Sequence, residues 1–235
     1  MTKFRTKLEA LDNMYLELLK NLNRTLDISI EALETGKVTE TMLGECYMVE
    51  TTINHLEQDV KEEAIVLIAR FQPAARDLRK LIMYIDSARL VERMGDLLKG
   101  GLSILKKLEG SENNINIYLY EKFLPLLKKI KKIYASYITT MVNEDINSLY
   151  ALLAMDKEID EYVTENTKFL VEVMKKDFSI IESGTLLLLL DRKFERVSDH
   201  ITHLVENLIF IIKGDNIRRT ELMDGDREDQ EDKNI

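Results

Sequence analysis

The sequence predicts an all-α protein of six long helices, arranged as two repeated three-helix bundles. Helix breakers are rare, with 9 Gly and 2 Pro in 235 residues, which favours long helices over turn-rich β structure. Apolar residues recur at steps of three and four, as on one face of an amphipathic helix. The segment RLVERMGD at 89–96 also returns as RKFERVSD at 192–199, 103 residues later, with its four charged positions kept.

The first half is expected to contain three helices. A glycine suits the left-handed residue that follows a helix, a threonine can cap a helix N-terminus, and a proline cannot continue a helix. The prolyl break falls at Pro73. The expected helices run from Phe4 to Gly36, from Thr39 or Thr41 to about Phe71, and from about Ala74 to Leu108.

The second half is expected to repeat this order after the polar segment GSENN at 110–114. The fourth helix begins near Tyr118 or at Pro125, and both starts remain open because proline is tolerated in a first turn and kinks a helix interior. The remaining bounds are Asn143 for the end of the fourth helix, Asp145 to Lys176 for the fifth, and a sixth that follows a turn at 177–179 and ends at Lys213 before Gly214. The two bundles would lie end to end or side by side.

These boundaries divide the chain into a first bundle at residues 1–110, a second bundle at 118–214 and a tail at 215–235. The tail holds eight acidic and four basic residues with few apolar ones. Such a composition cannot bury enough apolar surface to fold, so the tail is expected to be disordered.

Composition and charge exclude several classes of protein. The net charge is −9, and no basic tract interleaved with aromatic residues is present, so nucleic acid is not an expected partner. The single cysteine, Cys46, fits a reducing compartment. The longest apolar run, Leu186 to Leu190, is far shorter than the ~20 residues of a membrane span. A cytoplasmic protein with no membrane insertion is expected.

Paired acidic positions recur on helices of both halves. The third predicted helix of each half carries a Glu and an Asp at i and i+4, and the second helix carries a similar pair, so each pair projects from one helix face. These positions are Glu50, Asn54, Glu92 and Asp96 in the first half, and Asp156, Asp160, Glu195 and Asp199 in the second. Adjacent antiparallel helices would bring four such positions together in each bundle, a set suited to Mg²⁺, Mn²⁺, Ca²⁺ or iron.

A plainer interpretation of the same residues is also open. Arg89–Glu92 and Arg192–Glu195 would form exposed i, i+3 salt bridges worth about 0.3 kcal/mol each. Repetition of the same order in both halves favours a binding site, because a solvated face has no need to repeat its order. The arginines beside each Glu could pair with the carboxylates or meet an anion such as phosphate.

Catalytic chemistry is not expected from this sequence. Ferritin-like di-metal enzymes use a Glu-x-x-His motif, and none of the three histidines follows a glutamate by three residues. No phosphate-binding glycine loop or serine nucleophile elbow is present. His200 and His203, beside Asp199, could add metal ligands, contact phosphate or simply pack. A metal-dependent hydrolase is the least favoured alternative.

Three stretches resemble the PhoU family of phosphate-uptake regulators, which are duplicated three-helix bundles. They are similar to the family's Gln-Pro-x-Ala-x-Asp-Leu-Arg turn and to its Glu-Arg-Ile-Gly-Asp and Asp-x-x-Ile-Asp motifs. The stretches are FQPAARDLR at 71–79, ERMGD at 92–96 with its echo ERVSDH at 195–200, and DKEID at 156–160. The resemblance extends from about residue 4 to residue 214.

The resemblance implies a cytoplasmic negative regulator that couples a phosphate-importing ABC transporter, through its ATPase subunit PstB, to a membrane sensor histidine kinase, PhoR. It also implies a homodimer or higher oligomer, with clusters of divalent or trivalent metal ions, iron or zinc. The ligands carried over are Glu50, Glu92 and Asp96 in the first half, and Asp156, Asp160, Glu195 and Asp199 in the second. The alternative is a non-catalytic helical adaptor without metal, accessory to another phosphate transporter.

The sequence departs from the family pattern at positions that concern the first site. Asn54 stands where the family often has Asp, which removes a charge. The family's Asn four residues after the motif Asp is Gly100 in one half and His203 in the other. We therefore expect the second bundle to retain metal better than the first.

Overall fold

The computed structural model describes residues 2–109 and 118–214, and within these ranges every regular element is a helix. The all-α class predicted from the sequence is confirmed. The elements in chain order are α1 (Thr2–Thr35), α2 (Glu40–Phe71), α3 (Ala75–Leu108), η1 (Leu119–Phe123), α5 (Leu124–Asn143), α6 (Ile146–Ala154), α7 (Asp156–Lys176), η2 (Phe178–Ile180) and α8 (Ile181–Lys213). The predicted linker at 110–114 and the predicted tail at 215–235 lie outside the described residues.

Local signals end and begin most helices where the sequence predicts. Gly36, after α1, has a φ of 64°, a left-handed conformation that glycine adopts at little cost. The hydroxyl of Thr39, rather than that of Thr41, accepts a 3.2 Å hydrogen bond from the Met42 amide at the start of α2. Gly214 ends α8 with a φ of 85°, and its amide donates to Phe210 O at 2.9 Å.

The fourth predicted helix combines both of its proposed starts. The chain is helical from Tyr118, makes one π-helical turn at Leu119–Phe123 and then enters α5, with Pro125 in the first turn of that helix. The Leu124 amide donates to Leu119 O, five residues back. Because Pro125 has no amide proton, it cannot make the usual bond to residue 121, and the wider turn directly precedes it.

The fifth predicted helix is present as two segments, which corrects the expectation of one helix from Asp145 to Lys176. Asp145 caps α6 as predicted, accepting from the amides of Asn147 and Ser148. The segments meet at Met155, whose amide donates to Leu152 O at 3.1 Å, an i→i+3 bond that tightens the last turn of α6. The interruption makes Asp156 the first residue of α7.

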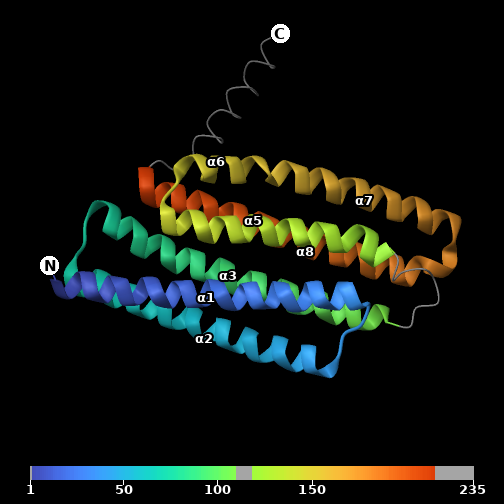
Figure 1. The fold of residues 1–235 in the computed structure, drawn as a ribbon, viewed down its shortest axis with the longest axis horizontal. Coiled ribbons are helices and arrows are strands. Elements are labelled where there is room, and N and C mark those ends of the chain that lie inside the picture. Colours follow the sequence, from blue (N-terminus) through green and yellow to red (C-terminus); the bar gives the residue numbers. More distant parts are fainter. Residues whose placement is uncertain (1, 110–117, 215–235) are drawn as a thin grey trace, which may run out of the picture.

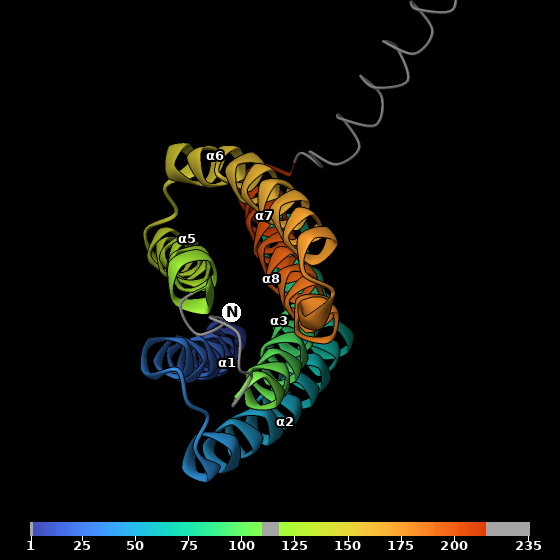
Figure 2. The same ribbon diagram turned by 90° about the vertical axis from the view of Figure 1, so that its right-hand side faces the viewer.

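The two halves lie side by side. Helices α2, α3, α8 and α7 form one curved row, in which α3 and α8 are the central pair, and α1 and α5 cover the concave side of that row (Figure 1, Figure 2). The third helices of the two repeats therefore pack against each other. This places the two predicted acidic faces in one row of helices, the first between α2 and α3 and the second between α7 and α8.

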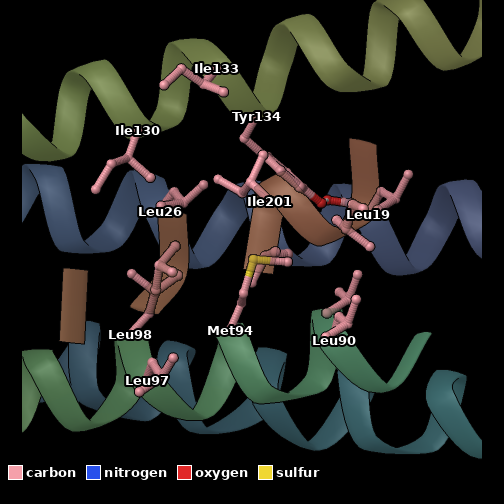
Figure 3. Packing of buried hydrophobic residues seen from close by; sticks show 14 of the residues in the cluster. Leu19, Leu26, Leu90, Met94, Leu97, Leu98, Ile130, Ile133, Tyr134 and Ile201 are labelled. Atoms are coloured by element: carbon pink, nitrogen blue, oxygen red, sulfur yellow. The ribbon is translucent and has the colours of Figure 1, made fainter. Parts of the chain in front are cut away.

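One hydrophobic core runs through both halves. Leu19 and Leu26 from α1, Met94 from α3, Ile130 from α5 and Ile201 from α8 converge in the middle of the molecule (Figure 3) and are buried. The buried hydroxyl of Tyr134 donates to Leu19 O at 2.8 Å. The repeats thus share a core instead of building two separate ones.

None of the described helices is both long enough and apolar enough to cross a lipid bilayer.

Candidate metal centre

Three of the predicted acidic residues meet where the start of α7 packs against the middle of α8. Asp156 and Asp160 lie one turn apart at the start of α7, and Asp199 lies on the neighbouring α8. One carboxylate oxygen from each lies within 4.8 Å of the others. Asp156 and Asp199 are half-buried and Asp160 is exposed, so the cluster is accessible to solvent on the side of Asp160.

Local structure positions this cluster. Asp156 and Asp160 are at i and i+4 and therefore share a face of α7, which packs against α8. The hydroxyl of Ser198 donates to Asp156 Oδ1 at 3.2 Å and holds that carboxylate toward α8. The N-terminal end of a helix also favours negative charge, which lowers the cost of placing aspartates in the first turn of α7.

The electrostatics of the cluster favour a bound cation. Burial, followed by the charges of Asp156, Glu195 and Asp160, raises the pKa of Asp199 to about 6. Burial and the charge of Asp156 also raise the pKa of Asp160. Mutual repulsion of carboxylates is relieved when an opposite charge lies between them. Three hard oxygen donors that repel one another therefore fit a divalent or trivalent metal ion.

The fourth predicted ligand of this half, Glu195, is partly engaged elsewhere. Arg192 Nη1 lies 2.6 Å from Glu195 Oε2, one turn back on the same helix. The i, i+3 salt bridge that the sequence left as an alternative is therefore present at this position. The charge of Glu195 still contributes to raising the pKa of Asp199, so the carboxylate borders the cluster.

The corresponding positions of the first half are arranged differently. Glu50 on α2 is only 7% exposed, and Asn54 Nδ2 donates to its Oε1 at 2.9 Å. Lys99 Nζ, from α3, lies 3.0 Å from Glu50 Oε2. Burial by itself would raise the pKa of Glu50, but the bonds from Lys99 and Asn54 outweigh it and hold that pKa below its usual range.

Glu92 and Asp96 complete the first set of predicted positions. Burial, then the charges of Asp96 and Glu57, raises the pKa of Glu92, while Asp96 is exposed. Glu92 borders an open groove of about 570 Å³ between α2 and α3, whose lining residues are Asn54, Glu57, Gln58, Lys61, Arg89 and Glu92. Across residues 2–109 and 118–214, the group of three close acidic donors is formed by Asp156, Asp160 and Asp199, and the first-half residues do not form another.

His200, the histidine directly after Asp199, is arranged for packing. His200 is buried, and neither of its ring nitrogens has a hydrogen-bond partner among the described residues. Burial first, then the nearby charges of His203, Arg196 and Arg93, lowers the pKa of His200 to about 4. A neutral, buried imidazole on α8 fits the packing role that the sequence left open.

Two residues that contact the predicted ligands were not identified from the sequence. Lys99 follows Asp96 by three residues and Ser198 directly precedes Asp199. Each reaches a carboxylate on a neighbouring helix, Glu50 and Asp156 respectively. The sequence places Lys99 on the same helix face as Asp96, one turn later. That Lys99 contacts Glu50 depends on how α2 and α3 are aligned, which the sequence does not specify.

The chain is similar to curated phosphate-specific transport system accessory proteins. PhoU homolog 1 of Thermotoga maritima is 27% identical over 216 residues, which cover 92% of this chain and 91% of the relative. The PhoU homolog of Rhizobium meliloti is 32% identical over 175 residues, which cover 70% of this chain and 69% of the relative.

The fold is also that of solved PhoU proteins. The crystal structure of PhoU from Pseudomonas aeruginosa matches with a TM-score of 0.82 at 22% identity, covering 90% of this chain and 100% of that chain. The regulatory protein PhoU from Streptococcus pneumoniae matches with a TM-score of 0.77 at 23% identity. The family model of the PhoU domain matches residues 9–100 and again residues 124–208, one match in each half. The chain therefore belongs to the PhoU family.

Proposed function

We propose that this protein regulates phosphate uptake. The observation that carries the proposal is the similarity along nearly the whole chain to proteins named phosphate-specific transport system accessory proteins. The relatives and the chain share length as well as sequence, since the Thermotoga maritima protein is covered over 91% of its own residues. Because the similarity covers most of the relative, we transfer its role in phosphate transport to this chain.

The finer proposal is that the protein is a cytoplasmic negative regulator without catalytic activity. It couples the ATPase subunit PstB of a phosphate ABC importer to the sensor histidine kinase PhoR. The long helices support this by offering extended exposed faces on which a partner could dock. A homodimer or higher oligomer is part of the proposal, and light scattering of the purified protein measures it.

The group at Asp156, Asp160 and Asp199 would hold the metal ions of this regulator. The donor set fits, because three carboxylate oxygens converge within 4.8 Å, and burial together with their mutual repulsion raises the pKa of Asp199 and of Asp160. A bound cation supplies positive charge that lets the carboxylates approach one another. With the cation bound, these residues would fix the angle between the start of α7 and the middle of α8. A partner that docks on the surface of these two helices could then bind the metal-loaded and the metal-free protein differently.

A metal-free helical adaptor is the second candidate, and two observations favour it. Arg192 pairs with Glu195, and Lys99 pairs with Glu50, so two of the seven predicted ligands already have cationic partners. Elemental analysis of protein purified without a metal-chelating tag separates the candidates. Stoichiometric metal that is lost in Asp160→Asn and kept in the exposed control Glu165→Gln supports the metal-binding regulator.

The regulatory role is tested with the protein's own transporter and kinase. Untagged protein should co-purify with the ATPase subunit and with the sensor kinase from membranes of phosphate-replete cells. Deletion of the gene should leave the phosphate-starvation response switched on in high phosphate. Failure to recover either partner, together with normal repression in the deletion strain, would show that the regulatory proposal is wrong.

A further inference from the structure

The two halves differ at two positions next to the predicted metal ligands. Glu92 and Asp96 have their repeats in Glu195 and Asp199, 103 residues later, and the same interval relates Lys99 to Thr202. On the preceding helices, the pair Glu50 and Asn54 corresponds to the pair Asp156 and Asp160. The first half therefore has an amide where the second has a carboxylate, and an ammonium where the second has a hydroxyl.

Both differing residues contact the same carboxylate. Lys99 Nζ lies 3.0 Å from Glu50 Oε2 and Asn54 Nδ2 lies 2.9 Å from Glu50 Oε1. Each oxygen of Glu50 thus accepts from a nitrogen of the protein. The ammonium is further held by the ring of Tyr47, whose centroid is 5.6 Å away, a distance at which cation–π attraction operates.

The formal charges of the two clusters show the consequence. In the second half, Asp156, Asp160, Glu195 and Asp199 are four acids, of which Glu195 pairs with Arg192, whose side chain is 66% exposed. In the first half, Glu50, Glu92 and Asp96 are three acids, and the charge of Lys99 is of opposite sign. A metal ion entering the first half would have to displace the ammonium from a carboxylate whose side chain is 9% exposed. The side chain of Lys99 is itself 39% exposed, so the ion pair is half-buried, and losing the ammonium would leave the nearly buried carboxylate of Glu50 without its cationic partner.

We propose that the ammonium of Lys99, with the amide of Asn54, takes the place of a metal ion in the first half, so that only the second half of this protein is a metal site. The inference rests on the metal site proposed for Asp156, Asp160 and Asp199. It adds that the repeat has one half stabilised by an internal cation and one half open to an external cation. Two residues determine which half is which.

The experiment converts the first half into the pattern of the second. The background is Asp156→Asn/Asp160→Asn, which removes the second site. Into it are placed Asn54→Asp and Lys99→Thr, and Mn²⁺ binding is measured by equilibrium dialysis and by the electron paramagnetic resonance signal of bound Mn²⁺. Binding should rise from none to about one equivalent per chain, the content expected of a single carboxylate site. The control is the same background with Asn143→Asp and Lys107→Thr, two exposed positions with the same total charge change.

The natural protein provides a second arm that does not depend on the folding of a multiple variant. Glu50→Gln should leave the Mn²⁺ content unchanged, whereas Asp156→Asn should abolish it. Loss of metal in Glu50→Gln, or no gain in the converted first half while the fold is intact by circular dichroism, would overturn the inference. If the natural protein binds no Mn²⁺ but the converted half does, the metal part of the proposed function fails and the role of Lys99 stands.

Discussion

The amide of Asn166 on α7 donates a 2.7 Å hydrogen bond to Asp191 Oδ2 on α8. Asp191 is fully buried, and its other oxygen has no partner among the described residues. The hydroxyl of Tyr118, just before η1, donates to the side-chain oxygen Oδ1 of the same Asn166. A buried aspartate thus lies at the junction of three segments, and its ionisation affects how they pack.

The protein should lose stability as the pH rises from about 4 to about 7. Burial raises the pKa of Asp191 from 3.8 to about 7, so between these values the folded state binds a proton that the unfolded state has released. The stabilising contribution is complete below pH 4 and is lost progressively as the pH rises toward 7, by roughly 1–4 kcal/mol. Urea unfolding of the natural protein and of Asp191→Asn from pH 4 to 8 measures this.

The exposed substitution Asp59→Asn makes the same charge change elsewhere and serves as the control. As the pH rises, the unfolding free energy of Asp191→Asn should increase relative to that of Asp59→Asn. A difference that stays constant with pH would show that Asp191 is ionised throughout.

Two glycines should respond to alanine in opposite directions. Gly44 is exposed within α2, and a methyl group there meets no atom within 4 Å, so Gly44→Ala should stabilise by about 0.5–1 kcal/mol. Gly214 has a φ of 85° at the end of α8, where a side chain is strained, so Gly214→Ala should destabilise by about 1 kcal/mol. Thermal unfolding of both variants measures this, and a shared sign would contradict the argument.

Neutralising Asp199 should make the metal-free protein more stable. Its carboxylate is half-buried beside Asp156 and Asp160, so Asp199→Asn relieves repulsion and should raise the unfolding free energy by about 1 kcal/mol. The same variant should lose the stabilisation given by Mn²⁺, which is about 2.7 kcal/mol at 100 times Kd. Differential scanning calorimetry with and without Mn²⁺ compares Asp199→Asn with the control Glu165→Gln. The control should neither gain stability without metal nor lose the stabilisation by Mn²⁺.

Sequence patterns predicted the helices because their signals are local. Gly36, Thr39 and Gly214 act within one turn of their own positions, so the caps could be assigned without knowing the fold. The break at Met155 could not, because no glycine or proline marks it. The side-by-side packing of α3 and α8 also depends on faces that are apolar in both halves and compatible with several arrangements.

The acidic positions of the candidate site and the direction of its asymmetry were predictable from the sequence, but the contact of Lys99 with Glu50 was not. The spacing of Asp156, Asp160 and Asp199 placed them on adjacent helix faces, and the structure brings them together. The pairing of Lys99 with Glu50 requires the register between α2 and α3, which the spacing along each helix leaves undetermined. Asn54 alone therefore hinted at a difference that Lys99 makes much larger.

Asn207 links the two halves of the molecule. Asn207 on α8 is buried and donates from Nδ2 to Asp86 Oδ2 at 2.9 Å and to Ser87 Oγ at 3.1 Å, both on α3. Asn207→Ala removes both bonds and leaves the Ser87 hydroxyl buried, so it should destabilise by about 1–3 kcal/mol. Asn143→Ala, at an exposed position of α5, should change stability by less than about 0.5 kcal/mol.

The shape of the unfolding transition tests the shared core at the same time. Because α3, α8, α1 and α5 contribute to one hydrophobic cluster, neither half can leave the interface without exposing apolar surface of the other. Urea unfolding of Asn207→Ala should therefore remain a single transition with an unchanged slope and a lower midpoint. Two separate transitions in fluorescence and circular dichroism would show instead that each repeat folds by itself and that Asn207 only holds two independent bundles together.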